Sequence, residues 1–214
     1  MRARYFAAVV AILALAGARA DAPAKTYAEL VTQAETGDAA TDFTALRIAY
    51  AQSPGYDPYG YASGAKFGEL WPAFKAKDCA KVFAVSDEML KSDYTLASVH
   101  IIRSECYRLA GDDQREAREE MIGRGLANSL TASGDGKSTK TAYVVVTMSE
   151  ERFLLVALGL HEEKQSLIRD GGHVYDLIEG PNEKPGGDAS AFFNVDALFA
   201  GMARQFQKTG AAAP

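Results

Sequence analysis

The segment "SLTASGDGKSTKTAYVVVTM", residues 129–148, decides the fold because the hydrophobic period of the chain changes within it. From residue 64 to residue 131 the apolar residues recur at the spacing of amphipathic helices. After residue 140 the run "TAYVVVTM" is rich in β-branched and aromatic residues, which indicates a strand. The segment therefore predicts a helical part followed by a sheet.

The loop "SGDGKS", residues 133–138, ends in the last three letters of a phosphate-binding loop. That motif requires a glycine at the position that Thr131 occupies here. It also requires a strand before the loop and a helix after it, and this chain has the reverse order. The loop is therefore predicted to be a sharp turn in which Gly134 and Gly136 supply the backbone freedom.

Two helices before this loop form a predicted hairpin. Asp78 and Asp112 are good N-caps and lie 34 residues apart, which is the length of a tetratricopeptide unit, and Gly111 is typical of a C-cap. We expect a tetratricopeptide-like hairpin inside a helical part that covers residues 42–132.

The two cysteines are predicted to join the open ends of that hairpin. Cys79 begins one helix and Cys106 lies near the end of the next, each 13 residues from a turn at Ser92-Asp93. In an antiparallel hairpin those positions face each other. An oxidising compartment would make a disulfide stable there.

The chain after residue 132 predicts a β-α-β-β-β-α order over residues 133–207. The whole is then an α+β protein with a mainly antiparallel sheet. The expected strands are 141–148, 160–170, 173–179 and 191–196; Ser149 is expected to cap a helix ending at Gly159, a last helix covers 197–207, and 208–214 form a disordered tail.

The first twenty residues have the pattern of a secretory signal peptide. Arg2 and Arg4 precede a short apolar run, and the segment ends in Ala18-Arg19-Ala20. We expect cleavage after Ala20, no stable membrane anchor afterwards, and a periplasmic or secreted protein; residues 21–41 are then a tether and a first helix.

The charge balance argues against nucleic acid as a partner. The chain has 23 basic and 28 acidic residues, and loss of the signal removes three arginines, so 20 basic residues face 28 acidic ones. The resulting net charge of −8 and the lack of a basic stripe do not suit a phosphate backbone.

No spacing in the sequence indicates a metal, a cofactor or a set of catalytic residues. Residues 160–170 and 173–179 are predicted to form a β-hairpin that turns at Gly171-Gly172. His100 lies on a helix face, His173 lies beside this turn, and His161 lies near the opposite end of the β-hairpin. Glu150 and Glu151 begin a helix, where the dipole favours carboxylates without any catalytic role. Two carboxylates can still converge in space, but the sequence does not single out a pair.

Several segments together resemble a known family. "YDPYGY" (56–61), "SGDGKS" (133–138), "TAYVVVTMSEE", "LGLHEEKQSLI", "VYDL" and "FFNVD" occur in this order. This pattern resembles a family of secreted bacterial proteins catalogued as domain of unknown function 4919, over roughly residues 42–200. The loop and Gln165 are its most specific pieces, and Asn194 stands where the family pattern has aspartate. The resemblance implies an architecture and no activity.

Three functional hypotheses follow. The first is a non-enzymatic module that binds an unknown protein or peptide on the concave face of the helical hairpin. The second is a hydrolase with a site around the 133–138 loop. The third is a purely structural factor of the cell envelope. The candidate loop site comprises Ser133, Gly134, Asp135, Gly136, Ser138, His100 and Gln165.

Overall fold

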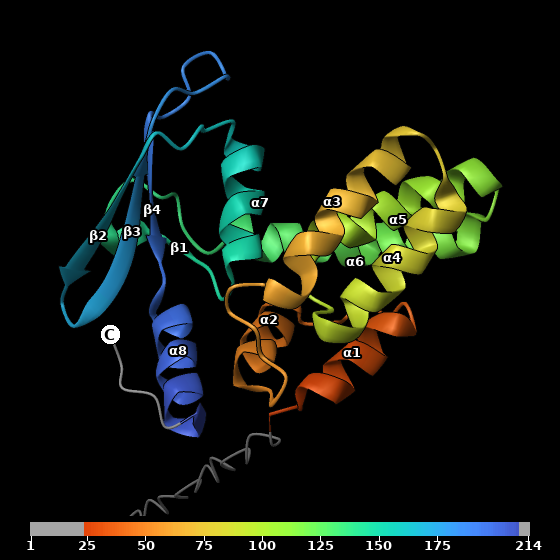
Figure 1. The fold of residues 1–214 in the computed structure, drawn as a ribbon, viewed down its shortest axis with the longest axis horizontal. Coiled ribbons are helices and arrows are strands. Elements are labelled where there is room, and N and C mark those ends of the chain that lie inside the picture. The colour runs from red at the N-terminus through yellow and green to blue at the C-terminus, as the bar shows by residue number, and fades with distance from the viewer. Residues whose placement is uncertain (1–23, 210–214) are drawn as a thin grey trace, which may run out of the picture.

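A computed structural model describes residues 24–209, which form a helical part and a sheet part side by side (Figure 1). The helices are α1 (Tyr27–Glu35), α2 (Phe43–Gln52), α3 (Tyr61–Lys75), α4 (Cys79–Ser92), α5 (Ala97–Ala110), α6 (Asp113–Thr131), the 3-10 turn η1 (Thr139–Thr141), α7 (Met148–Leu158) and α8 (Asp196–Thr209). The strands are β1 (Tyr143–Val144), β2 (Lys164–Asp170), β3 (His173–Glu179) and β4 (Ser190–Asn194). The α+β class and the order of its two parts are as predicted.

The predicted signal peptide, residues 1–20, lies outside the described residues, as do residues 210–214 of the predicted tail. The last helix continues to Thr209, so the start predicted for the tail at residue 208 is two residues too early. No helix within residues 24–209 has the length and apolar character needed to span a bilayer.

The start of α4, the end of α5 and the start of α6 lie where the capping residues predict. Asp78 accepts a hydrogen bond from the N–H of Lys81, and Asp112 accepts one from the N–H of Arg115. Gly111 ends α5 with a φ of 70°, a left-handed conformation that costs little for glycine. The hairpin packs on α3 through a core that comprises Leu70, Ala73, Val82, Met89, Leu96, Val99, Ile102 and Cys106.

The predicted disulfide is confirmed. Cys79 and Cys106 are bonded, with their Cα atoms 5.4 Å apart. The bond closes the end of the α4–α5 hairpin that is opposite its turn, over a sequence separation of 27 residues. It therefore constrains most of the hairpin in the unfolded chain.

Removing this disulfide is expected to destabilise the protein. We expect the double variant Cys79→Ser/Cys106→Ser to lose roughly 3.5 kcal/mol of unfolding free energy, because the unfolded chain regains the entropy of a loop of this length. Urea unfolding of the oxidised wild type and of the variant measures this loss. A change below about 1 kcal/mol, or two free thiols in the denatured wild type, would contradict the prediction.

The sheet has the order β1-β4-β3-β2 and is mainly antiparallel. The β2–β3 and β3–β4 pairs are antiparallel, whereas β1 pairs with β4 in parallel. The hairpin turn at Gly171-Gly172 is confirmed. Helices α7 and α8 lie between the sheet and the helical part (Figure 1). The core beneath them includes Leu154, Ile178, Phe193 and Leu198.

The first predicted strand is too long, and the predicted N-cap of the helix after it is the wrong residue. The strand covers only Tyr143–Val144 instead of 141–148. The chain leaves the sheet early because the N–H of Val146 donates to the carboxylate of Glu150 (2.7 Å) instead of to a strand. Thr147, not Ser149, caps α7. Val145 and Val146, which suggested a longer strand, are buried in the core instead.

Two other strand boundaries also differ from the prediction. Strand β2 begins at Lys164 rather than at residue 160, because Leu160 forms an isolated bridge with Asn182. Strand β4 ends at Asn194, and Asp196 begins α8 instead of ending the strand.

Candidate functional site

Ser133, the first residue of the 133–138 loop, links the end of α6 to β1 by two hydrogen bonds. Ser133 Oγ donates to the carbonyl oxygen of Leu130 (2.6 Å) and accepts from the N–H of Val144 (2.9 Å). These two bonds fix the hydroxyl between a helix end and a strand. It is therefore not poised as a nucleophile.

The glycines and N–H groups of the loop serve the turn itself. The N–H groups of Asp135 and Gly136 both donate to the carbonyl oxygen of Thr141, at 2.9 and 2.8 Å. Gly136 has a φ of 70°, and a Cβ at Gly134 would lie 2.4 Å from the carbonyl oxygen of Ala142. Because these two donors are engaged inside the loop, they are not available to an anion.

Asp135 is exposed and bonded locally. The Thr141 hydroxyl and the N–H of Lys137 hold the pKa of its carboxyl below the usual range. The hydroxyl of Ser138 contacts that of Thr141 at 3.1 Å. These contacts are typical of a closed turn.

His100 is buried in the helical part and is not part of the loop. Its Nδ1 lies 2.7 Å from Glu119 Oε2, and its Nε2 lies 2.9 Å from the carbonyl oxygen of Tyr94. Both ring nitrogens are therefore engaged by oxygen atoms of the helical part. Burial would raise the pKa of Glu119, but hydrogen bonds from His100 and Arg103 lower it.

Gln165 lies on the edge strand β2, away from both of these groups. Its Nε2 donates to Asp176 Oδ2 at 2.8 Å. Within residues 24–209, no hydrogen bond or ion pair joins Gln165, His100 and the loop to one another. The structure thus keeps Ser133 to Ser138 together and places the other two candidates at separate points.

The carboxyl pair of Glu151 and Asp176 is a feature that the sequence analysis did not identify. Glu151 comes from the first turn of α7 and Asp176 from the middle of β3; they are 1% and 7% exposed. Their carboxyl groups are hydrogen-bonded to each other. Burial and the charges of Asp176 and Glu162 raise the pKa of Glu151 to about 8. Burial also raises the pKa of Asp176.

A signal for this pair was present in the strand "HVYDLIE". Asp176 lies between Val174 and Ile178 at every second position of the strand, so all three share the face that α7 and α8 cover. A carboxylate at a core-facing position needs a partner, since an isolated buried charge is costly. The sequence analysis explained Glu150 and Glu151 by the helix dipole. That explanation suits exposed carboxylates, whereas these two are buried and need bonded partners.

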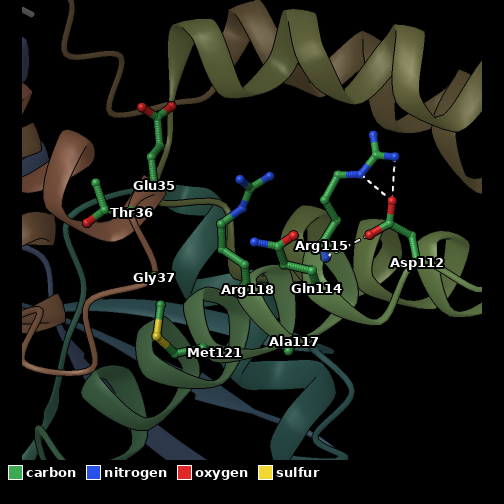
Figure 2. A pocket seen from close by; sticks show the side chains of 9 residues that line it. All are labelled: Glu35, Thr36, Gly37, Asp112, Gln114, Arg115, Ala117, Arg118 and Met121. Atoms are coloured by element: carbon green, nitrogen blue, oxygen red, sulfur yellow. Dashed lines mark hydrogen bonds and ion pairs between the residues drawn. The ribbon is translucent and has the colours of Figure 1, made fainter.

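The helical part has a groove on its surface. It consists of two adjoining hollows of about 630 and 550 Å³, both of which Glu35 lines. The first lies between the end of α1 and the first half of α6 (Figure 2). The second continues along α1 to the facing sides of α4 and α5. We call the two hollows together the helical groove.

Charged side chains in the helical groove differ in how they are paired. Arg115 is bound by Asp112, as the dashed lines in Figure 2 show. Arg118 rises into the open space, and its nearest carboxylate oxygen, from Glu119, is 3.9 Å away. Glu35 extends into the same space from the opposite side. The groove therefore presents one guanidinium and one carboxylate for which no hydrogen bond is found in the described part of the chain.

No group of three or more His, Cys, Asp or Glu side chains within residues 24–209 is arranged to hold a metal ion. Neither the curated proteins nor the solved structures gave a match to this chain. A family model does match, over residues 21–203. The chain therefore belongs to the family described as domain of unknown function (DUF4919).

Proposed function

We propose that the protein is a non-enzymatic binding module that holds a peptide or a protein segment in the helical groove. The observation that carries the proposal is the helical groove and the guanidinium of Arg118 in it, for which no hydrogen bond is found among the described residues. A guanidinium whose one carboxylate contact is as long as 3.9 Å keeps N–H donors for bidentate recognition of another carboxylate. The expected segment therefore carries an acidic side chain or a terminal carboxylate.

The second hollow adds apolar specificity to this site. Tyr27, Val31, Leu90 and Tyr94 line it beside charged residues. An apolar side chain of the bound segment would fit here, one or more residues away from the carboxylate that contacts Arg118. The proposed ligand is thus a mixed acidic and apolar segment, met in the periplasm or outside the cell, where the sequence of residues 1–20 would direct the protein.

The alternative, a hydrolase around the 133–138 loop with His100, has less support. Both nitrogens of His100 face acceptors inside the helical part, and the hydroxyl of Ser133 is bonded to α6 and β1. Screening hydrolytic substrates with the wild type and with Asp135→Ala tests this alternative. Only an activity that depends on Asp135 would favour it.

Charge reversal at Arg118 is expected to weaken peptide binding at least about tenfold, since a charge-assisted bond becomes a repulsion. Peptides selected from a random library on the chain from Asp21 onward should be rich in Asp or Glu. Their dissociation constants for wild type and Arg118→Glu then measure the effect.

Arg124→Glu is the matched control, because Arg124 lies on the same helix, is exposed and does not line the groove. Its affinity for the selected peptides should equal that of the wild type. Peptides that bind Arg118→Glu as tightly as the wild type would place the site elsewhere. A library from which nothing is enriched would count against the binding function itself.

A further inference from the structure

The Glu151–Asp176 pair carries a negative charge with which no cation of residues 24–209 forms an ion pair. Two carboxyl groups in contact share a proton, so the pair retains about one negative charge near neutral pH. No Lys, Arg or His within residues 24–209 forms an ion pair with either group. Oε2 of Glu151 is buried and has no donor from any other described residue. The pair therefore has acceptor capacity that the fold does not use.

A hollow of about 430 Å³ gives access to Asp176 of this pair, and its volume is typical of small-ligand sites. Asp176 and Gln165 line it on the sheet side. The rest of the lining is mainly apolar and comes from β2, α8 and the segment before α3; it includes Tyr59, Leu167, Leu198, Phe199 and Met202. We call this space the sheet-edge hollow.

The exposure of the edge strand shows that the hollow is open to solvent. Leu167 is the cross-strand partner of Asp176 and lies on the same face of the sheet, yet it is 49% exposed. An exposed leucine next to a buried acid gives one wall that favours an apolar group and one end that favours a cation. These two features describe a single ligand chemistry.

We propose that the sheet-edge hollow binds a primary amine on an apolar body, with its ammonium group at Asp176 and Gln165. The amide nitrogen of Gln165 is engaged by Asp176, which leaves its carbonyl oxygen as an acceptor. Asp176 supplies the other acceptors and carries the negative charge of the pair, and an ammonium group has three donors to match them. The source of the amine is either a free alkylamine or a lysine side chain, since both present this chemistry.

Amine binding should release a proton. The charged groups that act on Glu151 are Asp176 from β3, Glu162 before β2 and Arg152 on its own helix. A bound ammonium adds a positive charge beside Asp176, which favours ionisation of Glu151. Because Glu151 keeps its proton at pH 7 in the free protein, the complex should release up to about one proton there. At pH 9.5 the carboxyl is already ionised, and the release should vanish.

Isothermal titration with three probes tests the proposal. Hexylamine is expected to bind with a dissociation constant of about 1 mM or lower, whereas hexanol, which has the same apolar body, should bind at least about tenfold more weakly. Acetyl-lysine amide with a free side chain separates the two sources: binding of this probe favours a peptide ligand, and binding of hexylamine alone favours a free amine. Titrations at pH 7 in two buffers of different ionisation enthalpy count the released protons.

Two variants locate the site. Asp176→Asn should weaken the binding of hexylamine at least about tenfold, because the ammonium group loses its charged acceptor. Leu167→Gln changes a half-exposed side chain, so it should fold normally and weaken hexylamine at least about threefold. Glu163→Gln, at an exposed acid just before β2, should change nothing. The proposal is overturned if hexylamine does not bind, if hexanol binds equally well, or if Leu167→Gln and a folded Asp176→Asn both bind like the wild type.

Discussion

Replacing Arg47 by Met is expected to lower the free energy of unfolding by about 3–5 kcal/mol, because it leaves a buried carboxylate without its partner. Arg47 on α2 and Glu150 on α7 form a bidentate pair with N–O distances of 2.7 and 2.9 Å. Their side chains are 2% and 4% exposed. The guanidinium also donates to the carbonyl oxygen of Val144 at 2.6 Å.

The position of this pair explains the size of the effect. It joins the helical part to the first turn of α7 and to the end of β1, so a single residue satisfies groups in both parts of the protein. Urea unfolding measures the change, and in a thermal scan the midpoint should fall by about 10 °C.

Two comparisons isolate the cause of this loss. Arg124→Met removes an exposed pair with Glu120 on α6 and should cost less than about 1 kcal/mol. The double variant Arg47→Met/Glu150→Met should lose less than the sum of the two single variants, because it leaves no unpaired buried charge. If the losses simply add, or if Arg47→Met costs no more than Arg124→Met, the buried pair does not hold the two parts together.

The helical part could be predicted from the sequence because its signals are local. Asp78, Gly111 and Asp112 act within one turn of their own positions. They predicted the start of α4, the end of α5 and the start of α6. The disulfide was predictable for the same reason, since register within one hairpin depends only on counting residues from its turn. The tetratricopeptide likeness of this hairpin stays a prediction.

The sheet was less predictable because tertiary contacts compete with local propensity. "YVVV" has the composition of a strand, but the carboxylate of Glu150 takes the N–H of Val146 and ends the strand at Val144. That carboxylate is itself held by Arg47, which lies 103 positions away in the chain. No window of the sequence contains both groups, so propensity alone gives a strand that is too long.

The candidate site residues also divide into those that the local sequence indicates and those that depend on tertiary packing. The five loop residues were found because glycines in a turn are conspicuous, but their donors and acceptors are used within the loop. Gln165 was singled out by family resemblance, and the structure places it against Asp176. The partner in α7 was missed, because the approach of Glu151 to β3 depends on how the helix packs over the sheet.

Glu151→Gln is expected to make the protein less sensitive to alkaline pH. Burial and the charge of Asp176 raise the pKa of Glu151 from its ordinary 4.5 to about 8 in the folded protein. Between these values the unfolded chain has lost the proton while the folded protein keeps it. The folded state therefore binds more protons, and stability falls as pH rises through this window. The stabilisation by the proton is complete below pH 4.5 and is lost above pH 8.

The size of this effect follows from the pKa difference. At about 1.4 kcal/mol for each pKa unit, the wild type should lose on the order of 5 kcal/mol through Glu151 alone between pH 4.5 and 8. Glutamine cannot ionise, and its amide can donate to Asp176 as the protonated acid does. The Glu151→Gln variant should lack this loss and should be the more stable protein at pH 9.

Asp93 also makes the unfolding free energy fall as pH rises, so the experiment has to separate its contribution from that of Glu151. It is buried in the turn between α4 and α5, and burial raises its pKa to about 7. Urea unfolding at several pH values between 4.5 and 9.5 should therefore show a remaining decline in Glu151→Gln, and a smaller one when Asp93→Asn is added. The exposed acid Glu163 supplies the control, since Glu163→Gln should follow the wild-type curve. If wild type and Glu151→Gln instead lose the same stability between pH 5 and 9, Glu151 is ionised in the folded protein at neutral pH, and the shared proton at Asp176 does not exist.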